Sequence, residues 1–339
     1  MIRVAMLSFW HVHAKDYARM ASQHPDTEIV AVWDGDAQRG REKADEFSVR
    51  FYENLEELLS NPDIDAVIVD TPTTAHRDVI IAAARAGKHV FTEKVVATTT
   101  KECKEILAAV EAAGVKLTVS LPRLYTGFTQ SIMKSIHEGD LGTISTVRIR
   151  LAHNGALPTE SNPNGSLPSY FFNLASCGGG ALMDLGCHPM YLTRLFLGLP
   201  ESVSASFGYI TGREVEDSAV ATLRYPNGAL GIVEAGFVNS YSQFDIEVQG
   251  TEGSMKYSRT DDLVYIRSSK LSGEAAEWQV AQELPASLPT PFEQWVSHMQ
   301  NQTTASENIQ LALDLTRLME ASTQSAQTGT AIYLRDLTE

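Results

Sequence analysis

The densest group of residues able to do chemistry is a glycine-rich segment near the middle of the chain. Gly178, Gly179 and Gly180 lead into a helical stretch that carries Asp184 and His188 four residues apart. Residues at this spacing project from one face of a helix, so the acid can fix the tautomer of the imidazole and stabilise its charged form. This pattern suits general acid–base catalysis near neutral pH, although a plain i, i+4 ion pair has the same spacing.

A second candidate is the dipeptide Glu93-Lys94, which follows the apolar run 89–91. Parallel strands direct their carboxyl ends toward the ligand crevice of a doubly wound sheet. A lysine there can hold a substrate hydroxyl and stabilise the alkoxide that develops when a hydride leaves. On position alone, a solvated surface pair is the commoner arrangement for such a dipeptide.

The turn formed by residues 8–14 follows the first apolar run, where a dinucleotide-binding fold carries its Gly-x-Gly-x-x-Gly fingerprint. Here Ser8, Trp10 and His13 stand at the three glycine positions. The next helix still offers backbone N–H groups to a phosphate, but Trp10 would crowd the approach. Taken alone, this turn does not predict nucleotide binding.

Asp34 ends the second apolar run. In a dinucleotide-binding unit an acid at this point accepts hydrogen bonds from the ribose hydroxyls and repels a 2′-phosphate, which favours NAD over NADP. The sequence Asp34-Gly35-Asp36 also fits a simple polar turn.

Two patterns bear on metals and thiols. His11 and His13 imitate the H-x-H ligands of amidohydrolase barrels, which need eight strand–helix units and further ligands. Strand–helix alternation stops near residue 120, so a metal-dependent hydrolase is a remote hypothesis and we predict no metal site. The three cysteines, Cys103, Cys177 and Cys187, suit neither a disulfide framework nor a zinc knuckle.

The first 120 residues alternate short β-rich runs with helical ones. We expect strands over 2–7, 29–33, 49–52, 66–69, 89–91 and 116–119, and helices over 13–22, 37–47, 54–59, 79–86 and 101–113. This alternation requires right-handed crossovers and a mostly parallel sheet. The sequence therefore predicts a Rossmann-like, doubly wound domain over residues 1–120.

Residues 121–339 follow a different pattern, with polar and apolar residues alternating in runs over 147–151, 203–209, 218–225, 229–237 and 244–249. Asn227-Gly228 between two runs is a strong hairpin signal. A terminal helix is expected over 307–323, and the loop 153–175 is either a lid or binding loop or a mobile excursion. We predict a mostly antiparallel, open β-sheet domain flanked by helices, so the whole chain combines α/β and α+β classes.

Charge and length narrow the range of partners. The chain has 339 residues and a formal net charge of −15, which disfavours nucleic acid and anionic membrane surfaces. No apolar run approaches the ~20 residues of a membrane span, and the N-terminal apolar stretch is too short for a signal peptide. With three cysteines, a reducing, cytoplasmic compartment is the default expectation.

Taken together, these segments resemble the Gfo/Idh/MocA family of NAD(P)-dependent oxidoreductases from Ile2 to about Gly329. Glu93-Lys94 match the family's Glu-Lys-Pro motif, with Val95 in place of the proline. The family's stretch Gly-Gly-Gly-x-Leu-x-Asp-x-Gly-x-His is reproduced over 178–188, and Thr71-Pro72 with His76 resembles its Thr-Pro-x-x-x-His cofactor loop. In the second half, 216–217, 227–229 and 250–254 resemble family hairpin and turn motifs. Two departures are the missing glycines and Tyr191, which stands where relatives often carry a second acid.

The resemblance implies roles for particular residues. Lys94, Asp184 and His188 would be catalytic, and Arg123 would bind substrate together with Asp184 and His188. The residues assigned to cofactor binding are Ser8, Trp10, His11, His13, Asp34, Thr71, Pro72, His76, Glu93 and Lys94. The expected cofactor is NAD, with NADP less favoured, and the expected assembly is a homodimer or homotetramer formed through the C-terminal sheet.

The leading hypothesis from this resemblance is a dehydrogenase acting on a sugar, a polyol or a related hydroxy compound. His188 would remove the hydroxyl proton, Lys94 would hydrogen-bond the same oxygen, and Asp184 would orient the group. The alternative is a catalytically silent sensor or regulator with the same fold, which the loss of all three glycines suggests.

Overall fold

The computed structural model describes residues 1–160, 162–241, 244–271, 277–281 and 284–337, so residue 161 of the expected 153–175 loop lies outside the described part. The chain divides into two compact units. The first combines Met1–Leu121 with Pro289–Thr316, and the second combines Pro122–Leu288 with Arg317–Glu339.

The first unit contains the predicted parallel sheet. Its six strands are β1 (Ile2–Leu7), β2 (Thr27–Trp33), β3 (Arg50–Tyr52), β4 (Ala66–Val69), β5 (His89–Thr92) and β6 (Leu117–Val119). They lie in the order β3-β2-β1-β4-β5-β6, and all the pairs are parallel. This is the strand order of a doubly wound dinucleotide-binding sheet, with the topological switch beside β1. The fold predicted for this part of the chain is confirmed.

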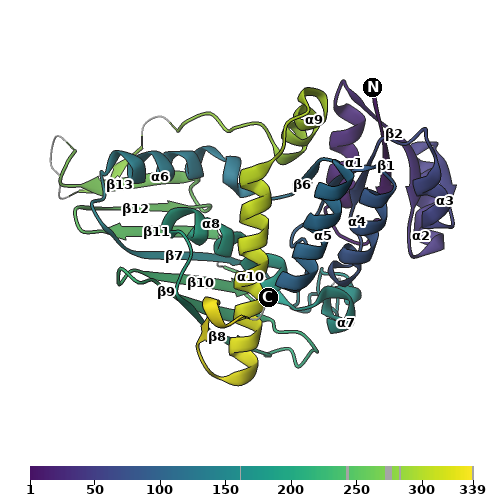
Figure 1. Ribbon diagram of the computed structural model, residues 1–339. Helices are drawn as coiled ribbons and strands as arrows, with labels where there is room; N and C mark the ends of the chain where they lie inside the picture. Colours follow the sequence, from purple (N-terminus) through teal and green to yellow (C-terminus); the bar gives the residue numbers. More distant parts are fainter. Residues whose placement is uncertain (161, 242–243, 272–276, 282–283, 338–339) are drawn as a thin grey trace. The chain divides into compact units, whose positions relative to one another are not determined.

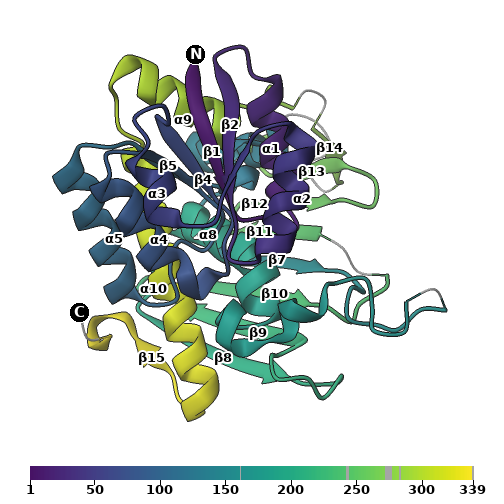
Figure 2. The same cartoon turned by 90° about the vertical axis from the view of Figure 1, so that its right-hand side faces the viewer.

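Helices cover both faces of this sheet, and Figure 2 shows α1 and α2 on one side of it and α4 and α5 on the other. The five are α1 (Ala14–Gln23), α2 (Ala37–Phe47), α3 (Leu55–Ser60), α4 (His76–Arg85) and α5 (Thr100–Ala113). Gly87 and Gly114 take left-handed φ values of 74° and 65° just beyond α4 and α5. Both helices therefore stop where the sequence indicated.

A C-terminal segment completes the core of the first unit. Helix α9 (Pro291–Asn301) begins with a capping box between Thr290 and Glu293. Its Phe292 and Trp295 pack on Phe91 of β5 at ring-centroid distances of 5.7 and 5.6 Å. The predicted second domain, 121–339, includes this segment, but the burial of its two aromatic side chains against β5 places it in the first unit.

The second unit contains a nine-stranded sheet in the order β14-β13-β12-β11-β7-β10-β9-β8-β15. The pair β7–β10 is parallel and the other pairs described are antiparallel. The strands are β7 (Ile144–Ala152), β8 (Ser202–Gly208), β9 (Ser218–Arg224), β10 (Leu230–Gly236), β11 (Phe244–Gly250), β12 (Gly253–Ser258), β13 (Leu263–Ser268), β14 (Gln279–Val280) and β15 (Ile332–Tyr333). The prediction of a mostly antiparallel sheet with helices is confirmed.

Helices of the same chain cover the apolar face of this sheet. Figure 1 shows α6 (Gly127–Glu138) and α8 (Cys187–Leu197) lying against it. Helix α10 (Ser306–Thr328) begins in the first unit and ends in the second, where Ser325 accepts the N–H of Ala205 in β8. On the opposite face Arg148 pairs with Glu234, and Arg150 with Asp245. In the part of the chain that the structure describes, no helix combines the length and apolarity needed to cross a bilayer.

Candidate active site

The carboxyl ends of β1, β4 and β5 meet at one edge of the first sheet, because the three strands are adjacent and parallel. Three of the segments that the sequence singled out follow directly from these ends: the turn 8–14, the Thr71-Pro72 loop and the Glu93-Lys94 pair. The first unit thus brings together much of the predicted cofactor-binding set.

The turn after β1 keeps the shape of a glycine turn without its glycines. Ser8, at the first glycine position, has a φ of 78°, a left-handed value that glycine normally supplies. Several backbone amides of the turn already have partners: Phe9 N–H donates to Asp34, Trp10 N–H to the hydroxyl of Ser8, and His11 N–H to a carbonyl. In a glycine-rich turn such amides would face the diphosphate.

Trp10 also distinguishes this turn from a glycine-rich one, because its large side chain is buried. The turn is therefore a compact, internally hydrogen-bonded structure.

Asp34 lies directly after β2 and fastens this turn. One carboxylate oxygen accepts from Phe9 N–H at 2.7 Å and from Arg39 Nε at 2.8 Å, while the other accepts from Asp36 N–H and Arg39 Nη2. The Asp34 side chain is buried. A two-pronged pair with arginine fixes the orientation of the carboxylate at the edge where a ribose binds in this fold.

His76 opens α4 and joins two loops at this edge. Its Nδ1 lies 3.0 Å from the carbonyl oxygen of Val95 and its Nε2 lies 3.1 Å from that of Thr71. A neutral imidazole has one N–H, so it donates to one of these carbonyls at a time. Burial lowers the pKa of His76 to about 4, against the opposing effect of the two carbonyls and of Glu93.

Glu93 and Lys94 are both buried, which corrects the expectation from position alone that they form a solvated surface pair. Lys94 Nζ lies 3.8 Å from Glu93 Oε1, which also accepts the Lys94 N–H. The Lys94–Val95 peptide bond is cis. Burial alone would raise the pKa of Glu93, but His11, His13 and Lys94 together lower it well below its usual range.

His11 and His13 converge on the same glutamate. Oε2 of Glu93 lies 3.2 Å from His13 Nδ1 and 3.8 Å from His11 Nδ1. The Tyr17 hydroxyl, one turn along α1 from His13, donates to the same oxygen and lies 2.7 Å from the Ser120 hydroxyl.

Two members of this neighbourhood, Tyr17 and Asp70, were missed at the sequence level. Asp70 is fully buried directly after β4, and its carboxyl oxygens make no hydrogen bond among the described residues. Burial, with the nearby charge of Glu93, raises its pKa well above the usual range. The signal for it was a carboxylate directly after a fully apolar strand, and for Tyr17 the i, i+4 spacing from His13.

In the second unit, the three glycines form a turn that is held by a buried acid. Glu216 accepts N–H groups from Gly180 and Leu182, both at 2.9 Å. A Cβ on Gly180 would lie 2.1 Å from the carbonyl oxygen of Glu216, so glycine is required there. Glu216 and the glycine motif are therefore one structural unit, although they are far apart in the sequence.

Asp184 lies in a π-helical turn, Leu182–Gly186, and His188 in the first turn of α8. The sequence predicts a helix here, kinked at Pro189, and does not indicate the π turn. Single π turns are rare and often occur at functional sites. One partner of His188 is Tyr191, whose hydroxyl lies 3.0 Å from the Nδ1 of His188. The role of Asp184 in orienting His188 stays a prediction.

Arg123 joins this second group. Its N–H donates to the Tyr191 oxygen at 3.1 Å, and its guanidinium lies 4.3 Å from the ring centroid of Phe244. Burial lowers the pKa of Arg123. The second unit thus brings the backbone of Arg123, the Tyr191 hydroxyl and His188 together, and a substrate-binding role for Arg123 stays a prediction.

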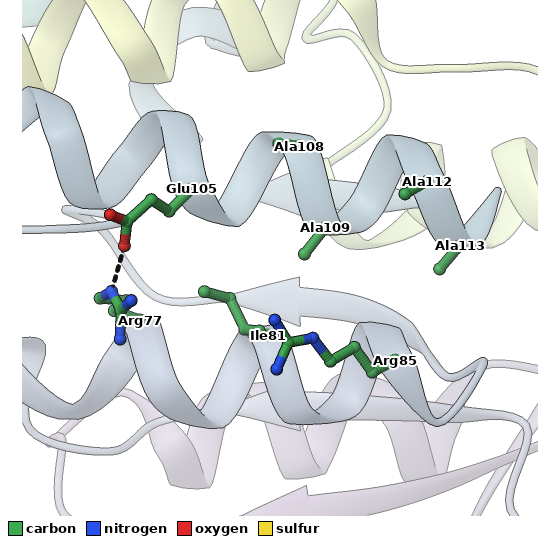
Figure 3. A pocket seen from close by; sticks show the side chains of 8 residues that line it. All are labelled: Arg77, Ile81, Arg85, Glu105, Ala108, Ala109, Ala112 and Ala113. Atoms are coloured by element: carbon green, nitrogen blue, oxygen red, sulfur yellow. Dashed lines mark hydrogen bonds and ion pairs between the residues drawn. The ribbon is translucent and has the colours of Figure 1, made fainter.

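A groove of about 570 Å³ on the first unit lies apart from these groups. Figure 3 shows it between α4 and α5, with Arg77 and Arg85 along one wall and four alanines along the other. None of the residues predicted to form the active site lines it.

The first unit has the fold of a dinucleotide-binding domain and carries a buried lysine, Lys94. The second unit is a mostly antiparallel sheet domain and carries the imidazole of His188. The chain belongs to the Gfo/Idh/MocA family: residues 3–121 match the oxidoreductase family's NAD-binding Rossmann fold, and residues 129–256 match the GFO/IDH/MocA C-terminal domain. The open six-stranded sheet also removes the barrel on which the metal-dependent hydrolase hypothesis depended.

Relatives of this chain act on sugars and cyclic polyols, according to their names. It is 30% identical to 1,5-anhydro-D-fructose reductase of Ensifer adhaerens over 71% of this chain and 72% of the relative. It is 29% identical to scyllo-inositol 2-dehydrogenase (NAD(+)) of Bacillus subtilis, over 75% of this chain and 73% of the relative. The structure of levoglucosan dehydrogenase in complex with NADH and levoglucosan matches with a TM-score of 0.82 and 22% identity, covering 98% of this chain and 99% of that one.

Proposed function

We propose that this protein transfers hydride between a nicotinamide dinucleotide and a CH–OH carbon of a sugar, polyol or related hydroxy compound. The observation that carries the proposal is Lys94, a buried ammonium beside Glu93 at the carboxyl ends of the parallel strands. Ligands of doubly wound sheets bind at this edge. The family and its sugar-directed relatives support the same chemistry.

The first unit fits a dinucleotide at several points. Ser8 keeps the left-handed backbone of the fingerprint turn, and Asp34 lies where the ribose hydroxyls would be held. Thr71, Pro72 and His76 form the loop beside them. Because Asp34 would repel a 2′-phosphate, we propose NAD as the preferred coenzyme.

In the direction of oxidation, the bound dinucleotide supplies the hydride acceptor. We assign removal of the substrate hydroxyl proton to Nε2 of His188. For this nitrogen to be unprotonated, Nδ1–H must donate to the Tyr191 oxygen, which has a second lone pair for the Arg123 N–H. Lys94 would donate a hydrogen bond to the reacting oxygen and stabilise its developing charge.

The test is a screen of sugars, anhydrosugars and inositols with NAD and with NADP, followed by Lys94→Met and His188→Asn. We expect kcat to fall roughly 10²- to 10⁴-fold in each variant, as for loss of a general acid–base group. Coenzyme binding to His188→Asn, measured calorimetrically, should stay within about threefold of wild type. Lys101→Met, which changes an exposed lysine of α5, is the control and should retain activity. Failure to bind either dinucleotide at millimolar concentration would overturn the proposal.

A regulator or sensor without catalysis is the second candidate, because the amides of the turn 8–14 are already occupied. Binding of a sugar-like ligand with no hydride transfer to any coenzyme would favour it. Turnover of any hydroxy compound would exclude it.

A further inference from the structure

The side chains that replace the fingerprint glycines form a compact group of nitrogen and oxygen donors. His11, His13 and Glu93 each offer one ligand atom, and these atoms lie within 4.8 Å of one another. They come from two segments about 80 residues apart, the turn after β1 and the end of β5. Neither the family's NAD-binding assignment nor the names of the relatives accounts for this grouping.

The spacing of the donors fits a small dication. Zn²⁺ binds histidine nitrogen and carboxylate oxygen at about 2.0–2.2 Å, so two ligands of a tetrahedral ion lie about 3.3–3.5 Å apart. The Glu93 oxygen lies 3.2 Å from His13 Nδ1 and 3.8 Å from His11 Nδ1. The third pair of donors, from the two imidazoles, lies within 4.8 Å, so binding of one ion by all three would need side-chain shifts of up to about 1 Å.

An ion at this point would replace one existing hydrogen bond. Nδ1 of His11 accepts the backbone N–H of His13 at 3.2 Å, so its single lone pair would have to leave this N–H in order to bind a metal. The Glu93 carboxylate oxygen, 3.8 Å from the same nitrogen, would share the ion with it.

The surroundings resemble the supporting shell of a built metal site. Glu93 and His11 are buried, and the Tyr17 hydroxyl orients the glutamate oxygen. His13 is partly exposed, which leaves a path for an ion to enter. The carboxyl group of Asp70, buried directly after β4, has no hydrogen-bond partner among the described residues.

We propose that His11, His13 and Glu93 form a three-ligand site for a divalent transition metal of the Zn²⁺ type. Two imidazoles and one carboxylate are a ligand set that zinc accepts, and three protein ligands leave a fourth position for water or an oxygen ligand. The ion would fasten the turn after β1 to the end of β5. The proposal does not depend on the oxidoreductase activity.

The experiment titrates tag-free, chelator-treated protein with Zn²⁺ alone, without coenzyme, by calorimetry and by metal analysis after gel filtration. We expect one equivalent per chain. His13→Gln should weaken binding at least tenfold, and the pair His11→Asn with His13→Gln should abolish it. His137→Gln, which changes an exposed histidine of α6, is the matched control and should bind as wild type does.

A second measurement guards against misfolding of the variants. Circular dichroism should show folded His13→Gln, and Zn²⁺ should raise the melting temperature of wild type but not of this variant. Co²⁺ in place of zinc should give the visible absorption of a tetrahedral site. The proposal is wrong if wild type retains no zinc, or if folded His13→Gln binds it as tightly as wild type. Neither result would bear on hydride transfer, which is measured separately.

Discussion

Tyr191 is the residue whose role differs most from what its position in the sequence suggested. Relatives often carry an acid there, and here a fully buried phenol contacts both His188 and the backbone of Arg123. Under the proposed function, Tyr191 would be a positioning residue that acts on the substrate only through His188.

We expect Tyr191→Phe to lower kcat about tenfold or more while changing KM less than about threefold, because the imidazole loses the partner that fixes its tautomer. Steady-state kinetics on the substrate found in the screen measure this. Tyr225→Phe is the control: its buried hydroxyl contacts a carbonyl of Gly198 at 3.4 Å, away from His188. Equal losses in the two variants would show a general packing effect instead.

His76 makes stability depend on pH. Its pKa is lowered to about 4 in the folded chain and is about 6.5 when unfolded, so between these values the unfolded state binds the extra proton. The free energy of unfolding is therefore highest, as far as His76 is concerned, above pH 6.5. It falls as the pH drops toward 4, by at most about 3 kcal/mol in total. Urea unfolding at pH 7, 6 and 5 should show a shallower acid slope for His76→Gln than for wild type. An identical slope in both proteins would mean that His76 titrates normally.

At the scale of elements, two neighbouring glycines before the π turn differ in how strictly their positions require glycine. Gly180→Ala places a methyl group 2.1 Å from a backbone oxygen of Glu216, whereas Gly179→Ala meets Cβ of Met183 at 3.0 Å, a tight contact that a shift of a few tenths of an ångström relieves. We expect Gly180→Ala to destabilise the protein by about 2–4 kcal/mol and Gly179→Ala by about 1 kcal/mol or less. Chemical denaturation of the two variants compares them directly; similar values would contradict the close packing against Glu216.

Sequence patterns predicted elements well where the signal is local. Continuous apolar runs such as Ala66–Val69 located strands of the first sheet, and Gly87 and Gly114 marked helix ends. The tertiary contacts had no such signal. Nothing near Glu93 indicated that His11 and His13 lie against it, because that contact joins segments about 80 residues apart.

Other omissions were avoidable. The capping box Thr290-Pro291-Phe292-Glu293 is a strong helix start, yet helix α9 was not expected, and neither was α6. The burial of Lys94 could not be read from a dipeptide that usually lies on the surface.

At the scale of the whole molecule, the first unit is discontinuous in sequence. A fragment ending at residue 121 should fail to fold cooperatively, because it lacks Phe292 and Trp295 of the core. In the full chain, Trp295→Ala should cost about 3–5 kcal/mol. Thermal unfolding followed by circular dichroism tests both; a cooperative melt of fragment 1–121 would contradict this account.

Association of subunits through the second sheet stays a prediction. We expected an apolar face in need of covering, but α6 and α8 of the same chain cover that face. The opposite face carries the ion pairs Arg148–Glu234 and Arg150–Asp245. Contacts there would be largely polar.

The late position of α9 has a consequence for biosynthesis. Val4 and Met6 share a hydrophobic core with Phe292 and Trp295. These two aromatic residues leave the ribosome only after the entire segment Pro122–Leu288 has been made. At about 5–20 residues per second, the nascent Rossmann sheet waits roughly 10–30 s for its last aromatic side chains. We expect one apolar surface of the sheet to stay uncovered during that interval and to bind chaperones that act on chains emerging during translation.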